Sequence, residues 1–145
     1  MKGRCSAPAN YEMLEHTADL RIEVRGKDVA ELLARCAGAL ADLLYDPAPV
    51  RAAIRRRVRL DEGNLEGLLV RWLNELIFLR EVKEFLWKRI EVETDGPSSL
   101  QAVLAGERFD PARHSPRTGL KAATYHQLGI ERGAEGWIAR ILFDV

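Results

Sequence analysis

A short stretch near the start of the chain gathers several side chains that can do chemistry. It reads LEHTADLRIEV, residues 14–24, and contains Glu15, His16, Thr17 and Asp19. Carboxylate and hydroxyl oxygens bind hard divalent cations, and an imidazole binds a metal or transfers a proton. The alternative is an ordinary turn, because Thr and Asp side chains hydrogen-bond to nearby backbone donors and a histidine can join such a network. These residues alone leave both interpretations open.

A second carboxylate stands at the far end of the sequence, where Asp144 follows the apolar run ILF and precedes Val145. We expect that run to form a strand, so Asp144 lies either at a strand end or in solvent. Two carboxylates at neighbouring strand ends repel each other, and a hard divalent cation between them would remove the repulsion. We therefore hypothesise a cation site made by Asp19 and Asp144, with the carboxylate of Val145 as a further oxygen. Spacing alone does not show that these groups meet.

Other kinds of site lack their sequence signal. There is no G-x-x-x-x-G-K or G-x-G-x-x-G motif for a nucleotide, and no G-x-S-x-G motif for a hydrolytic nucleophile. The histidines, His16, His114 and His126, include no pair at short zinc-ligand spacing. Cys5 lies in an expected leader. Cys36 lies on the apolar side of an expected helix, where we expect a free, buried thiol.

One segment is rich in arginine. Its members are Arg51, Arg55, Arg56, Arg57 and Arg59. Such a group could contact RNA or an acidic partner. We favour the solvated face of an edge strand, where charge discourages edge-to-edge pairing, because no aromatic residues alternate with these arginines.

Helices and strands must position all of these groups. Residues 20–26 alternate apolar and charged side chains, which is typical of a half-buried strand. Two helices follow, with a strand at 53–60 between them. Asp28 with Glu31 predicts a capping box at the start of the first helix. The second helix starts at Asn64, and its apolar residues, from Leu65 onward, recur three and four positions apart.

Strand patterns occupy the rest of the chain. They lie at 10–14, before the first helix, and at 85–94, 100–109, 120–131 and 137–145, after the second. We predict an α+β sandwich in which the two helices pack on one face of a mostly antiparallel or mixed sheet. Residues 1–9 are expected to be a flexible leader, and residues 10–145 to be one domain.

Composition limits the classes of function. The 145 residues are 47% hydrophobic and 30% charged, which is enough apolar material for a core and enough charge for a solvated surface. The formal net charge is zero, which argues against strong direct binding of nucleic acid. No apolar run is long enough to span a membrane and no signal peptide is evident, so we expect a cytoplasmic protein without a membrane partner.

Four segments together resemble the archease family. They are EHTAD at 15–19, LEGLLVRWLNELIFL at 65–79, KAATYH at 121–126 and the apolar strand that ends in DV, and they occur in the family's order and near its usual spacings. The resemblance extends from Tyr11 to Val145. Ala123 stands where valine is common in the family, and LRI follows the first motif where a VGI-like stretch is frequent.

The resemblance implies an accessory protein rather than an enzyme, with no small-molecule substrate of its own. Archeases activate RtcB-type RNA ligases in tRNA splicing: they promote guanylylation of the ligase and multiple turnover, and they broaden its use of nucleotides. The family is also described as a general chaperone or modulator of proteins that act on nucleic acids. We keep that description as the alternative. An uncharacterised metal-dependent hydrolase is the weakest hypothesis, since no constellation that activates water is evident.

The resemblance also implies a metal site, for which calcium is the expected divalent cation. Asp19 and Asp144 would be ligands, and Val145 would contribute through its backbone or terminal carboxylate. Lys121 would be a functional residue near the metal, and His16 and His126 would support the site. No family role is implied for the arginine-rich strand.

Overall fold

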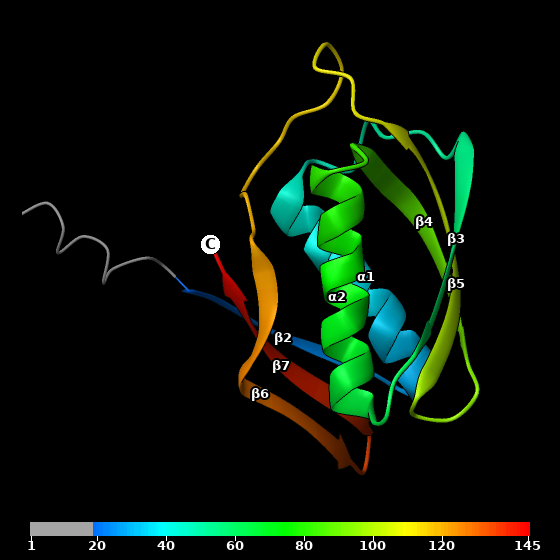
Figure 1. The fold of residues 1–145 in the computed structure, drawn as a ribbon, viewed down its shortest axis with the longest axis vertical. Coiled ribbons are helices and arrows are strands. Elements are labelled where there is room, and N and C mark those ends of the chain that lie inside the picture. The colour runs from blue at the N-terminus through cyan, green and yellow to red at the C-terminus, as the bar shows by residue number, and fades with distance from the viewer. Residues whose placement is uncertain (1–18) are drawn as a thin grey trace, which may run out of the picture.

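The computed structural model describes residues 19–145 (Figure 1). The predicted leader at 1–9, the predicted strand at 10–14, Cys5 and His16 lie outside the described residues. In chain order the elements are β2 (Asp19–Gly26), α1 (Val29–Leu44), β3 (Ile54–Asp61), α2 (Leu65–Glu81), β4 (Phe85–Thr94), β5 (Ser99–Arg108), β6 (Ala122–Gly133) and β7 (Gly136–Asp144).

The strands of residues 19–145 form two separate three-stranded sheets, with the orders β2–β7–β6 and β3–β5–β4, and their paired neighbours are all antiparallel. The two helices stand between the sheets (Figure 1). Helix α1 packs against β2 and β4, and α2 packs mainly against β6. The predicted α+β class, with two helices on antiparallel strands, is confirmed. The division of the strands into two sheets is an addition that the sequence pattern did not supply.

Both helices begin at the predicted caps. The Asp28 side chain accepts a hydrogen bond from the Glu31 N–H at 2.8 Å, and the Asn64 side chain accepts one from the Gly67 N–H at 2.8 Å. Each bond satisfies one of the free amide groups of the first helical turn. The Glu31 carboxylate accepts from the backbone N–H of Lys27 at 2.7 Å. The capping box is therefore displaced by one residue from the usual arrangement, in which the cap's own N–H is the donor.

Hydrogen-bonded aromatic side chains join the two helices to each other and to strand β4 inside the core. The indole N–H groups of Trp72 and Trp87 donate to the carbonyls of Leu33 and Ala37 in α1, both at 2.9 Å. The Tyr45 hydroxyl donates to the Trp87 carbonyl at 2.6 Å and accepts from the Trp87 N–H at 2.8 Å. These bonds satisfy buried polar groups, so the aromatic rings can fill the core without leaving unpaired donors.

The burial of Cys36 follows the sequence pattern, and the burial of Ile54 does not. Cys36 is fully buried and free, as predicted, and burial raises the pKa of its thiol to about 12. Strand alternation puts Ile54 on the same face of β3 as the buried residues Val58 and Leu60, but its side chain is 49% exposed because β3 begins there at the sheet edge. None of the described helices is both long and apolar enough to cross a membrane.

Candidate functional site

The two carboxylates that the sequence analysis singled out lie directly opposite each other. Asp19 is the first residue of β2 and Asp144 is the last residue of β7, and the antiparallel register pairs their Cα atoms. Side chains that are directly opposite point to the same face of a sheet, with Cβ atoms about 4.5–5.5 Å apart. The folding of β2 against β7 therefore brings together two residues separated by nearly the whole chain.

The face on which this pair lies follows from the burial pattern. Along β7, Ala139, Ile141 and Phe143 are buried against the helices, so Asp144 belongs to the opposite, outer face. Asp19 is exposed in the same way at the start of β2, where Leu20 and Ile22 pack against the core. The carboxylates are thus presented to solvent at one end of the β2–β7–β6 sheet.

The pair has chemistry that suits a hard cation. Like charges directly opposite each other on a sheet repel. Within residues 19–145, neither the Asp19 nor the Asp144 side chain forms an ion pair or a hydrogen bond that would offset this repulsion. A divalent cation would offset it, and calcium accepts carboxylate oxygens, backbone carbonyls and waters together. The two carboxylates are oxygen donors of the kind that calcium accepts, and residues 19–145 contain no group of three or more His, Cys, Asp or Glu side chains placed to hold a metal ion.

The other predicted site residues fall into distinct positions. Val145 directly follows Asp144 and packs, half-buried, against the core, so it lies beside the pair. The backbone N–H of Lys121 donates to the Asp144 carbonyl at 2.8 Å, which anchors the start of β6 next to the site. Lys121 is exposed, and it lines a surface hollow together with Phe78 of α2 and with Val82, the residue that directly follows α2.

The structure does not bring His126 to the carboxylates. Ala122 is the residue of β6 that pairs with Asp144, and His126 lies four residues further along, on the order of 13 Å away at the usual rise of a strand. His126 is exposed within an irregular part of β6 between Thr124 and Gly129, where its N–H donates to the Thr124 hydroxyl at 3.0 Å. It is therefore placed near Tyr125 and Gln127 on the surface, away from the pair.

Comparison with known proteins decides the family. The sequence profile of the archease protein family (MTH1598/TM1083) matches residues 11–145. The chain belongs to the archease family. It is 40% identical to the archease of Methanosarcina acetivorans over 139 residues, which cover 93% of this chain and 95% of that protein. It is 35% identical to the archease of Pyrobaculum calidifontis over 146 residues, 97% and 99% of the two chains.

Solved structures agree with this family assignment. The solution structure of Methanobacterium thermoautotrophicum protein 1598 superposes with a TM-score of 0.73 at 26% identity, and the match covers 89% of this archease and 94% of that chain. The crystal structure of a Thermotoga maritima archease, described as a possible chaperone, superposes with a TM-score of 0.66 and covers 98% of both chains. At 20% identity the Thermotoga structure supports the fold alone.

Sequence reasoning missed one residue that positions the site of this archease. Asn74, in the middle of α2, accepts a hydrogen bond from the Ala123 N–H at 2.8 Å and donates one to the Ala123 carbonyl at 3.3 Å. This amide holds β6 against α2 next to Lys121 and Ala122, which flank Asp144. The available signal was a half-buried polar residue inside an otherwise apolar helical stripe, which needs hydrogen-bond partners.

Proposed function

We propose that this archease is a cytoplasmic accessory protein that activates an RtcB-type RNA ligase in tRNA splicing. It would promote guanylylation of the ligase and multiple turnover, and it would broaden the nucleotides that the ligase accepts. The observation that carries the proposal is the cross-strand pair of Asp19 and Asp144, exposed at the end of a sheet in a chain that belongs to the archease family. On this proposal the protein performs no reaction itself.

The paired carboxylates give the proposal its physical basis. Asp19, Asp144 and the main-chain oxygen of Val145 would hold a divalent cation, for which we propose calcium. The bound cation would neutralise the two charges and could accept oxygen ligands from the ligase. Because both aspartates lie on the outer face at a strand end, a partner can reach them without disturbing the core. We expect Asp19 to approach the nucleotide pocket of the ligase, and a cross-link from position 19 to a distant ligase surface would contradict this arrangement.

The deciding experiment is RNA ligation by the cognate ligase, under single- and multiple-turnover conditions, with and without this protein. We expect the wild-type protein to permit multiple turnover and Asp19→Asn or Asp144→Asn to lose most of that stimulation, because each change removes one charged ligand. Glu131→Gln is the matched control, since Glu131 is an exposed carboxylate of the same sheet that binds Arg140 instead. Normal stimulation by both aspartate variants would refute the proposed mechanism.

A general chaperone is the second candidate, and the exposed apolar side chains favour it. Phe78 of α2 is 43% exposed, Val82 directly after α2 is 62% exposed, and Tyr125 of β6 is 62% exposed. Exposed apolar groups of this kind can bind partly folded clients. Assays of aggregation with unrelated client proteins distinguish the candidates. Protection that persists in Asp144→Asn and is lost when Phe78 and Val82 become serine would favour the chaperone.

A further inference from the structure

The outer face of the β3–β5–β4 sheet carries an ordered arrangement of charge. Three columns of side chains point away from the helices. The edge strand β3 supplies Arg55, Arg57 and Arg59; the central strand β5 supplies Gln101, Val103 and Ala105; and β4 supplies Arg89, Glu91 and Glu93. The face thus has a mainly basic edge that ends in the exposed carboxylate of Asp61, a neutral middle and a mainly acidic opposite edge. No described element covers it (Figure 1).

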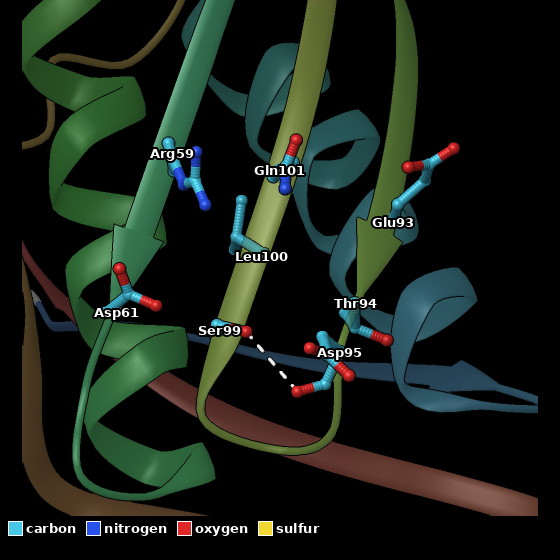
Figure 2. A pocket seen from close by; sticks show the side chains of 8 residues that line it. All are labelled: Arg59, Asp61, Glu93, Thr94, Asp95, Ser99, Leu100 and Gln101. Carbon is cyan, nitrogen blue, oxygen red and sulfur yellow. Dashed lines mark hydrogen bonds between the residues drawn. The ribbon is translucent and has the colours of Figure 1, made fainter.

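The strand register places these charges in rows. Arg57 and Glu91 both pair with Val103, and Arg59 and Glu93 both pair with Gln101. Each arginine is therefore separated from its glutamate by two strand spacings, roughly 10 Å. Figure 2 shows Arg59, Gln101 and Glu93 on three adjacent strands.

These charges are not neutralised locally. None of the four forms an ion pair with another residue between 19 and 145. The surface is hollow between them, over a volume of about 360 Å³ beside Val103. The face therefore offers both charge and space to a partner.

We propose that this face binds a second copy of the same chain, about a two-fold axis parallel to β5. Two arrangements stack the sheets face to face with their strands aligned. If the axis runs across the strands, β3 lies over β3 and arginine meets arginine. If the axis runs along β5, β3 of each copy lies over β4 of the other. Arg57 then meets Glu91 of the second copy, and Arg59 meets its Glu93. Charge complementarity selects the second arrangement.

The middle of the face suits such a contact. The β5 residues on the axis are uncharged, and Val103 would meet its own copy there. Depletion of charge at the centre, with charged residues at the rim, is typical of protein interfaces. The formal net charge of zero adds no long-range repulsion between copies. The row of Arg55 and Arg89 would bring arginine over arginine and lacks charge complementarity. The register of β4 is irregular beside this row, between Trp87 and Arg89. We therefore centre the contact on the rows of Arg57 and Arg59.

A nucleic acid fits this face less well than a second copy. The arginines of β3 could bind phosphates, but Glu91 and Glu93 would repel the same strand of phosphates from the other edge. A partner must instead carry acidic and basic columns at the same separation. A second copy has both columns at that separation by construction, which makes it the occupant that the charges favour.

Sedimentation velocity at several protein and salt concentrations tests the proposal without any ligase. We expect reversible dimers that weaken as salt is raised. Arg59→Glu and Glu93→Arg should each weaken self-association about tenfold or more, because each places like charges at both edges of the row through Gln101. An equimolar mixture of the two variants should recover dimers, since every altered row then joins opposite charges. Glu135→Arg, in the exposed turn between β6 and β7, is the matched control and should behave as wild type.

Three outcomes would overturn the proposal. The first is a wild-type protein that stays monomeric at every concentration and salt level. The second is a dimer that Arg59→Glu and Glu93→Arg leave unchanged, because the contact then uses another surface. The third is a monomer that binds single-stranded RNA, with binding lost in Arg59→Glu and strengthened in Glu93→Arg, because the arginine column is then an RNA contact.

Discussion

At the scale of single residues, the Glu107 carboxylate is held by a network of hydrogen bonds. It accepts hydrogen bonds from the Arg51 N–H at 2.7 Å, from His114 Nε2 at 3.0 Å and from the Arg113 guanidinium. The His114 ring is buried, and its Nδ1 accepts from the Asp110 N–H at 2.8 Å, so the ring proton lies on Nε2 and faces Glu107. The network ties the loop after β5 to the loop before β3.

The pKa of Glu107 makes this network sensitive to acid. Burial alone raises the pKa, but the hydrogen bonds from Arg51, His114 and Arg113, with the charge of Arg113, outweigh burial and lower the pKa from 4.5 to about 2. A carboxyl group whose pKa is lower in the folded state stabilises the fold fully above its unfolded pKa. That stabilisation is lost as the pH falls through the folded value. The sensitive window therefore runs from about pH 4.5 down to about 2.

We expect Glu107→Gln to lower the free energy of unfolding at pH 7 by about 1–3 kcal/mol, because charged hydrogen bonds are lost in a largely enclosed site. It should also flatten the decline of stability with acid in this window. Urea denaturation at a series of pH values measures both effects. Glu84→Gln removes an exposed carboxylate that forms a surface ion pair with Arg108, and it should change stability by less than about 0.5 kcal/mol. Equal losses in the two variants would contradict the role given to the network.

Sequence reasoning reached part of the residue-scale picture. It predicted strands next to Asp19 and Asp144 from the alternating and apolar runs that border them, and it left Asp144 either at a strand end or in solvent. It could not show that they are opposite each other, because alternation identifies the face of a strand and not its partner. The Glu107 network had no sequence signal, since its members come from β5 and from two separate loops. Cross-chain pairing of this kind depends on the folded topology.

At the scale of elements, the backbones of the paired strands β4 and β5 lie unusually close together near Gly106. A Cβ atom at this position would lie 1.8 Å from the Leu86 carbonyl oxygen and 2.7 Å from the Trp87 Cα. Both contacts are with backbone, which cannot move aside as a flexible side chain can. This close approach coincides with the start of the irregular register in β4. The Trp87 side chain next to it lies in the core, edge-to-face with the Tyr45 ring.

We therefore expect Gly106→Ala to destabilise the protein by about 1–3 kcal/mol, because the β4 backbone must shift to admit the methyl group. Gly38→Ala is the matched control, since a Cβ atom at Gly38, within α1, would meet nothing within 4 Å. That change should stabilise the protein by about 0.5–1 kcal/mol through higher helix propensity. Urea denaturation measures both variants. A stability at or above wild type in Gly106→Ala would show that the strands can separate there at little cost.

The elements themselves were largely predictable, and the sheets were not. Caps and apolar spacing gave both helices, and alternation gave every described strand within a few residues. A strand with one buried face has the same alternation in one six-stranded sheet as in two three-stranded sheets, so the pattern cannot distinguish them. The pattern also did not explain Arg56, which interrupts the apolar side of β3. In the structure its guanidinium lies over the Phe85 ring, 5.1 Å from the ring centroid.

At the scale of the whole molecule, the proposed cation would join the start of β2 to the end of β7. A ligand that binds only the folded state raises stability, by about 2.7 kcal/mol when its concentration is one hundred times the dissociation constant. We expect calcium to raise the melting temperature of the wild-type protein and to leave Asp144→Asn unchanged. Differential scanning calorimetry with calcium or with a chelator measures the response.

The same experiment has an internal check without metal. Asp144→Asn removes one of two repelling charges, so in chelator it should be as stable as wild type or more stable, by roughly 0.2–1 kcal/mol. Glu131→Gln should keep the calcium response of wild type. A calcium response that survives in Asp144→Asn would place the cation elsewhere.

The pairing of Asp19 with Asp144 also constrains how the gene can change. Side chains alternate between the two faces of a strand, so one residue inserted into β2 or β7 would rotate every position beyond it to the opposite face. A single insertion between Asp19 and Val24 would turn the first carboxylate toward the helices, or force Val24 out of the core. Two inserted residues would restore the alternation. Lineages that retain both aspartates should therefore lengthen these strands by even numbers of residues only.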